Sequence, residues 1–160
     1  MHGQISSDTP VGVPADLMWD VYRSFELGRL VDKLAADVLG RVEFLEGDGG
    51  VGSIVKFTFA AEPGSPGSGY MKEIFTKIDD ENRVKETEVI EGGYKALGFE
   101  VVRIRLEILE KDSESCIVRS CIEYEGDDKL ADVVSHVSVK PLEIMAEIVG
   151  KHLIQNKSTL

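Results

Sequence analysis

Hydrophobic and polar residues alternate along much of this chain, and the alternation predicts antiparallel strands. The clearest run is Val102, Ile104, Leu106 and Ile108, whose neighbours are mostly charged. A period of two places the apolar side chains on one face of a half-buried strand. Seven strands are expected, the first ending near residue 13 and the others at about 41–46, 53–60, 70–78, 83–90, 96–109 and 115–124.

Helical spacing appears in three segments. Pro14-Ala15-Asp16 begins a short helix that runs to about Tyr22, and a second short helix covers about 26–34. A long helix is expected over 129–155, with an apolar stripe along one side. Pro141 lies inside it and predicts a kink, because proline has no N–H to donate. The glycine- and proline-rich residues 62–69 predict a loop.

These elements predict an α+β fold in a single domain over residues 1–160. Its main layer is a curved seven-stranded antiparallel sheet that grips the long C-terminal helix, with two short helices after the first strand. A helix lying on a curved sheet leaves space between the two layers. We therefore expect an enclosed, largely apolar internal cavity for a ligand.

A glycine-rich segment, Gly47 to Ser53, resembles a nucleotide-binding motif in its spacing alone. Gly47, Gly49 and Gly52 match G-x-G-x-x-G, but that motif needs a helix next, so that the helix N-terminus can hold a phosphate. The residues that follow read as a strand, and Asp48 adds negative charge. The segment is therefore interpreted as a hairpin connection that binds no nucleotide.

Charge and composition limit the partners and the location. Lys and Arg number 18 against 29 Asp and Glu, a net charge of −11, which repels nucleic acid and anionic membranes. No apolar run reaches membrane-spanning length, and the N-terminus has no secretory pattern. We expect a cytoplasmic protein, monomeric or weakly dimeric.

The cysteines and histidines indicate no metal site and no cofactor. Cys116 and Cys121 lie five residues apart on one predicted strand, so their side chains face opposite sides. We expect two free thiols in a reducing compartment. The three histidines are far apart and form no ligand motif.

The order of these elements resembles that of the plant pathogenesis-related class 10 proteins, the fold of the major birch-pollen allergen. The glycine motif, the Pro14-Ala15-Asp16 start of the first helix and the final helix carry the resemblance over nearly the whole chain. Residues 47–53, 90–94 and Lys72-Glu73 are most similar to the norcoclaurine synthase and norbelladine synthase group. Those enzymes condense an arylethylamine with an aromatic aldehyde in plant alkaloid synthesis.

The resemblance implies roles for individual residues. The family glutamate corresponds to Glu73 and the family lysine to Lys85. The family tyrosine corresponds to Met71; the adjacent Tyr70 faces the other side of a strand and serves only if a bulge re-aims it. The family aspartate, which belongs to ring closure, corresponds to Ile104. This pattern implies amine–aldehyde condensation, for which norbelladine synthase is the better analogue.

Side-chain parity supports these positions independently. Glu73 shares a strand face with Met71 and Phe75, and Lys85 shares one with Thr87 and Val89. Lys85 is expected to be the main proton donor, with a pKa lowered by burial, while Glu73 holds the amine or moves its proton. By parity alone, however, a Lys–Glu pair on neighbouring strands is typical of an exposed cross-strand pair.

Two functions remain open from the residues. Lys85 and Glu73 favour a condensing enzyme for a small aromatic amine and aldehyde. Met71 and Ile104, at substituted positions, favour a non-catalytic carrier or sensor for a hydrophobic plant metabolite or hormone. A ribonuclease is disfavoured by the net charge of −11 and the lack of a paired histidine. In either case the substrate-binding walls are expected to comprise Met71, Phe75, Tyr94, Val102, Ile104, Val137 and Ile144.

Overall fold

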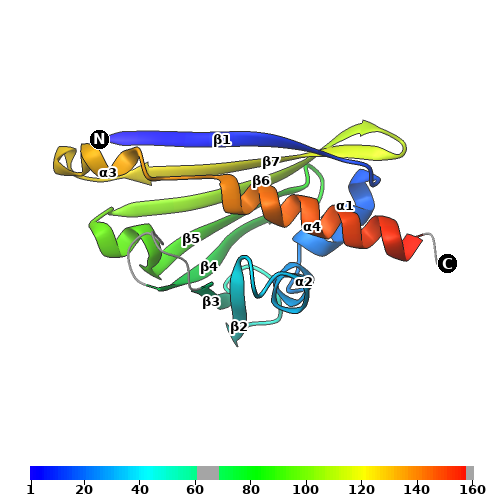
Figure 1. Ribbon diagram of the computed structural model, residues 1–160, viewed down its shortest axis with the longest axis horizontal. Coiled ribbons are helices and arrows are strands. Elements are labelled where there is room, and N and C mark those ends of the chain that lie inside the picture. The colour runs from blue at the N-terminus through cyan, green and yellow to red at the C-terminus, as the bar shows by residue number, and fades with distance from the viewer. Residues whose placement is uncertain (61–68, 158–160) are drawn as a thin grey trace.

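The structure is a computed structural model that describes residues 1–60 and 69–157. Its strands form one antiparallel sheet, and the helices lie to one side of that sheet (Figure 1). The strands are β1 (His2–Val11), β2 (Gly40–Glu46), β3 (Ile54–Phe59), β4 (Tyr70–Asp79), β5 (Val84–Gly92), β6 (Val101–Asp112) and β7 (Ser115–Glu125). The helices are α1 (Ala15–Tyr22), α2 (Glu26–Leu34), the 3₁₀ turns η1 (Gly93–Leu97) and η2 (Asp128–Leu130), α3 (Ala131–Val134) and α4 (Lys140–Lys157).

The strand order explains where the two short helices lie. The order is β1-β7-β6-β5-β4-β3-β2, so the first two strands of the chain occupy opposite edges of the sheet. The chain between them must cross one end of the sheet, and α1 and α2 make this crossing (Figure 1). The predicted seven-stranded antiparallel sheet, with two short helices after its first strand, is confirmed.

Helix α4 packs against β1, β7, α1 and α2. Ala146 and Val149 are completely buried on its inner side. Gly150 permits the close approach to β1, because a Cβ atom there would lie 2.4 Å from Cγ1 of Val11. The amphipathic stripe of the sequence therefore covers the sheet as expected.

The C-terminal helix is not continuous, and that part of the prediction is wrong. The expected helix over 129–155 is divided into η2, α3 and α4, and residues 135–139 are not helical. Pro141 does not kink a helix interior. It lies in the first turn of α4, where an N–H has no carbonyl partner within the helix and its loss costs little.

The strand expected over 96–109 also begins later than predicted, at Val101. The preceding residues form η1, which is bounded by glycines with left-handed φ angles, 75° at Gly92 and 113° at Gly98. These angles suit glycine and turn the chain out of β5 before β6 begins. The loop predicted over 62–69 falls, apart from Gly69, outside the described residues.

The glycine-rich segment joins β2 to β3, which confirms its interpretation as a hairpin connection. Gly47, Gly49 and Gly52 have φ angles of 88°, 102° and 92°. The Gly49 N–H donates to Ser53 Oγ at 2.9 Å, and the Gly50 N–H donates to Asp48 Oδ1 at 3.0 Å. These amides are therefore bonded within the loop.

Two further expectations concern the thiols and the membrane. Cys116 and Cys121 are both free, as predicted; Cys116 is buried and Cys121 is partly exposed. Within residues 1–60 and 69–157, no helix combines the length and the apolar character needed to cross a bilayer.

Candidate active site

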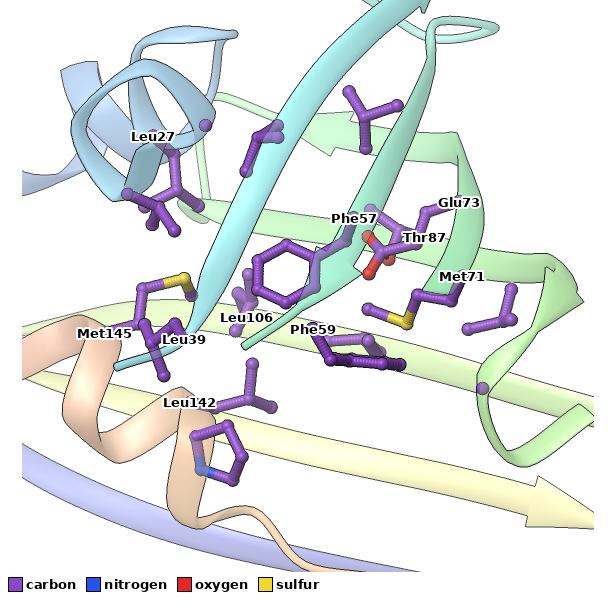
Figure 2. A pocket seen from close by; sticks show the side chains of 18 of the residues that line it. Leu27, Leu39, Phe57, Phe59, Met71, Glu73, Thr87, Leu106, Leu142 and Met145 are labelled. Atoms are coloured by element: carbon purple, nitrogen blue, oxygen red, sulfur yellow. Dashed lines mark hydrogen bonds between the residues drawn. The ribbon is translucent and has the colours of Figure 1, made fainter. Parts of the chain in front are cut away.

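A cavity of about 530 Å³ lies between the sheet, α2 and the N-terminal part of α4. Its walls are largely apolar, and aromatic rings and methionines form much of the surface shown in Figure 2. The predicted internal cavity is therefore present. The polar or titratable side chains among its lining residues are Ser24, Glu73, Lys85, Thr87, Tyr94, His136, Ser138 and Lys140.

Alternation along β4 and β5 brings the two principal charged groups inside. Glu73 points into the cavity from β4, and Lys85 points into it from β5. The alternate residues Glu86 and Glu88 face outward, where they pair with Arg105 and Arg103 on β6. The interpretation of Lys85 and Glu73 as an exposed surface pair is therefore wrong.

Lys85 is held by two uncharged groups. Its side chain is only 2% exposed, and its Nζ donates a hydrogen bond of 2.9 Å to the Tyr22 carbonyl at the end of α1. The same Nζ lies 3.9 Å from the centroid of the Phe75 ring. Burial lowers the pKa of Lys85 to about 8, and the negative charge of Glu73 partly opposes this shift.

Glu73 is held by the hydroxyl of Thr87. Its Oε2 accepts a hydrogen bond of 3.1 Å from the Thr87 hydroxyl, and Figure 2 shows the two side chains meeting beside Phe57. Burial raises the pKa of Glu73, while the Thr87 hydrogen bond and the positive charge of Lys85 lower it. No ion pair joins Glu73 to Lys85 in the part of the chain that the structure describes.

The separation of these anchors has a chemical consequence. Lys85 is fixed by a carbonyl and a ring face, and Glu73 by a hydroxyl, so neither group neutralises the other through direct contact. An ammonium with a lowered pKa is a suitable proton donor, and a carboxylate with a raised pKa is a suitable proton acceptor. The cavity therefore holds an acid and a base at different places on one apolar wall.

Tyr70 lies outside the cavity, and we correct its expected role. Its hydroxyl donates to Glu91 Oε2 at 2.9 Å on the outer face, where Lys72 pairs with the same carboxylate. The register does shift between Lys72 and Glu73, but this bulge follows Tyr70 and does not turn its ring inward. The inward position is taken by Met71.

Six of the seven expected wall residues line the cavity. These are Met71, Phe75, Tyr94, Val102, Ile104 and Ile144. Val137 is the exception: it is buried in the hydrophobic core and does not line the cavity. The break between α3 and α4 explains this difference, because Val137 does not lie on a continuous helical face.

The sequence reasoning missed a second polar cluster at the start of α4. The Tyr94 hydroxyl donates to the His136 carbonyl at 3.3 Å and accepts from the Ser138 N–H at 3.1 Å. These bonds tie η1 to the segment that precedes α4. His136, Ser138 and Lys140 line the cavity beside this tie. The apolar spacing of residues 129–155 predicts a continuous helix there, so it predicts no turn at these residues.

Thr87 was also missed as a site residue, although a signal was present. It lies two residues after Lys85, so the parity that turns Lys85 inward also turns Thr87 inward. Its hydrogen-bond partner depends on how β4 and β5 align.

Across the described residues, no three side chains of His, Cys, Asp or Glu come together in a way that could hold a metal ion.

Comparison with known proteins agrees with this geometry. The family model described as "Pathogenesis-related protein Bet v 1 family" matches residues 1–156. Norbelladine synthase of Narcissus pseudonarcissus is 44% identical over 158 residues, covering 99% of this chain and 96% of that protein. S-norcoclaurine synthase 2 of Papaver somniferum is 35% identical over 156 residues, covering 96% of this chain; the chain spans 66% of that enzyme's length.

A solved structure agrees with the fold in detail. Norcoclaurine synthase from Thalictrum flavum, in complex with dopamine and hydroxybenzaldehyde, superposes with a TM-score of 0.85 at 28% sequence identity. The match covers 97% of this chain and 88% of that one. The chain is thus similar in both sequence and structure to enzymes that are named as synthases.

Proposed function

The chain belongs to the pathogenesis-related protein Bet v 1 family, and from that premise we propose that it condenses an arylethylamine with an aromatic aldehyde through an imine in plant alkaloid biosynthesis. One observation carries this proposal: Lys85 and Glu73 face the same apolar cavity but are held by different partners. The names of the synthases that are 44% and 35% identical support the reaction class. The bound dopamine and hydroxybenzaldehyde of the norcoclaurine synthase structure support the substrate class.

The reaction begins with proton removal from the amine. An arylethylamine enters as an ammonium ion, and Glu73 takes one of its protons, since burial raises the pKa of this carboxyl. The freed nitrogen attacks the carbonyl carbon of the aldehyde. Lys85 hydrogen-bonds to the carbonyl oxygen and stabilises the negative charge that develops there. The added nitrogen loses a proton as the oxygen gains one, and a neutral carbinolamine results.

Loss of water completes the reaction. Lys85 protonates the carbinolamine hydroxyl, which leaves as water while the nitrogen lone pair forms the C=N bond of a protonated imine. The proton that Glu73 took then restores Lys85 to its ammonium form. The sum is one ammonium and one aldehyde converted to one protonated imine and one water, with the protein returned to its starting state.

Two apolar side chains on the same sheet as Lys85 and Glu73 support a reaction that ends at the imine. Ile104 and Met71 present a branched hydrocarbon and a thioether side chain where the family resemblance places an aspartate and a tyrosine. Neither side chain removes a proton from an aromatic ring. Ring closure would need such a base, so we propose condensation without cyclisation.

The rest of the molecule suits these substrates. Two aromatic rings require apolar walls, which Phe57, Phe59 and Met145 contribute around the cavity (Figure 2). The net charge of −11 attracts a cationic amine and repels nucleic acid. We further propose a cytoplasmic protein that acts as a monomer or weak dimer.

The direct test is turnover. The protein is incubated with dopamine or tyramine and a panel of aromatic aldehydes, with or without borohydride quenching, and the products are read by mass. An imine gains two hydrogens on reduction, whereas a ring-closed isomer does not. The proposal requires faster formation of the reducible product than in buffer alone; equal rates with and without protein overturn it.

A second candidate function is supported by the same cavity. Its largely apolar lining and volume of about 530 Å³ suit a small hydrophobic metabolite that is carried without being changed. The family also includes proteins named as allergens, such as the major allergen Pru av 1 of Prunus avium, 31% identical over 119 residues. Tight binding of an aromatic ligand, together with no turnover of any amine–aldehyde pair, favours this candidate.

A further inference from the structure

Thr87 is buried between the two groups that the proposed reaction uses. Its side chain is 3% exposed, on β5, two residues from Lys85. Its Cα pairs with Phe75 on β4 and with Ile104 on β6, so its strand neighbours on both sides are apolar. A hydroxyl buried in this way needs a hydrogen-bond partner, because leaving it without one is costly.

The partner that the hydroxyl finds is Glu73. The bond is diagonal, because Glu73 pairs in register with Val89 rather than with Thr87. Register shifts between β4 and β5 lie on both sides of this segment, at Lys72/Glu73 and at Phe75/Lys77. Such irregularities change the direction of side chains near sites, and here they bring the carboxylate and the hydroxyl within 3.1 Å.

The bond occupies one oxygen of the carboxylate of Glu73, a residue that lines the cavity, and leaves the other oxygen available for a ligand. Among the described residues, Glu73 Oε1 has no hydrogen-bond partner, while Oε2 accepts the hydrogen bond from the Thr87 hydroxyl. The elements β3, β6 and α4 line the cavity with apolar side chains such as Phe57, Ile104 and Met145. The field of Lys85 lowers the pKa of Glu73, and the other titratable lining groups are Tyr94, His136 and Lys140.

We propose that Thr87 is a positioning residue for Glu73: its hydroxyl holds Oε2, so that Oε1 points at the incoming amine and the carboxylate is ionised when the amine arrives. This inference rests on the proposed function for the role of the amine. The bond itself opposes the effect of burial, which raises the pKa of Glu73. Loss of the hydroxyl therefore shifts the titration of Glu73 to higher pH.

The experiment compares Thr87→Val, which removes the hydroxyl and keeps the shape, with Thr87→Ser, which keeps the hydroxyl. Thr76→Val is the matched control, because Thr76 lies on the exposed face of β4 and its hydroxyl donates to the Glu86 carbonyl across the same strand pair. Two quantities are measured for each protein. One is the pH profile of kcat/KM for condensation, and the other is the titration of the Glu73 carboxyl by ¹³C NMR, assigned with Glu73→Gln.

In Thr87→Val, both the acidic limb of the kcat/KM profile and the titration of the Glu73 carboxyl move to higher pH. At pH values on that acidic limb, kcat/KM falls about tenfold. Thr87→Ser and Thr76→Val keep the values of the starting protein. An unchanged titration in Thr87→Val overturns the inference, and so does an equal shift in Thr87→Ser. If Thr87→Val does not fold, Thr87→Cys, of similar volume and with only a weak donor, replaces it.

The two proposals fail in different ways. The NMR titration needs no substrate, so it decides whether Thr87 holds Glu73 even if no amine–aldehyde pair reacts. If the starting protein shows no turnover, the proposed function is wrong and the role toward an amine is withdrawn with it. If Glu73→Gln slows condensation but Thr87→Val does not, the proposed function stands and the positioning role is wrong.

Discussion

The ammonium of Lys85 lies over the face of the Phe75 ring, 3.9 Å from its centroid, while the Tyr22 carbonyl holds the same nitrogen at 2.9 Å. An ammonium has three N–H donors. One is bonded to the carbonyl and a second lies against the ring, so one remains for a ligand in the cavity. This arrangement gives a single proton a defined direction, which general acid catalysis requires.

We predict that Lys85→Ala lowers the rate of imine formation by about 10²-fold or more, the usual scale for loss of a general acid. Ligand affinity changes much less, because the apolar walls provide most of the contact area. Steady-state kinetics and calorimetric binding of the aldehyde measure the two effects. Lys72→Ala is the control, since Lys72 pairs with Glu91 on the outer face. An unchanged rate in Lys85→Ala with intact binding would falsify the catalytic role and favour a carrier.

The Phe75 ring is predicted to support the charged form of Lys85. Phe75→Leu removes the ring face, so the ammonium loses a favourable contact and its pKa falls below the present value of about 8. The descending, alkaline limb of the pH–rate profile should move to lower pH. Phe57→Leu, which changes another aromatic residue of the cavity wall, should leave that limb in place. If both variants shift the limb equally, the ring contact has no specific effect.

Lys85 should also make the stability of the protein depend on pH in the alkaline range. Its pKa is lowered from 10.5 to about 8, so between these values the unfolded chain binds more protons than the folded one. The contribution of this lysine to the free energy of unfolding therefore rises with pH across that range, by roughly 3 kcal/mol in all. Below pH 8 both states are protonated, and the full cost of burying the charge is present.

Comparison with Lys85→Met isolates this effect. Methionine has a similar shape and no charge, so the stability of the variant relative to the starting protein should be greatest near neutral pH and should decline by pH 10.5. Urea denaturation at both pH values measures it, and Lys72→Met serves as the exposed control. A difference that stays constant with pH would show that Lys85 titrates normally in the folded protein.

The glycine-rich hairpin is predicted to bind neither NAD nor ATP with submicromolar affinity. Its amides at Gly49 and Gly50 already donate to Ser53 and Asp48, and β3 rather than a helix follows. A phosphate would thus meet no free amide cradle and no helix dipole, and it would meet the charge of Asp48. Isothermal calorimetry with each nucleotide tests this, and a dissociation constant below micromolar would contradict it.

Local pattern alone determined most of the fold and half of the candidate site. Alternation between apolar and polar residues is a property of neighbouring residues, so it placed Glu73 on the strand face of Met71 and Phe75, and Lys85 on that of Thr87 and Val89. The same parity also fits an exposed cross-strand pair, and the structure decided that both faces point inward. The same parity placed Tyr70 on the strand face opposite Met71 and Glu73. The resemblance to a family identified which of these inward residues matter, because periodicity does not distinguish a functional lysine from a surface one.

The tertiary structure alone decided which partners these groups have. Lys85 bonds to Tyr22, 63 residues away, and Tyr94 bonds to the His136 carbonyl, 42 residues away. Such contacts depend on how α1, η1 and the α3–α4 segment pack on the sheet, and no local pattern encodes them. The break before α4 has the same origin. The apolar spacing of residues 129–155 resembles that of one helix, but the bonds from Tyr94 hold residues 136 and 138 in a non-helical segment. Pairing Thr87 with Glu73 likewise required the register shifts of β4 against β5, since a carboxylate and a hydroxyl on separate strands meet only after the strands are aligned.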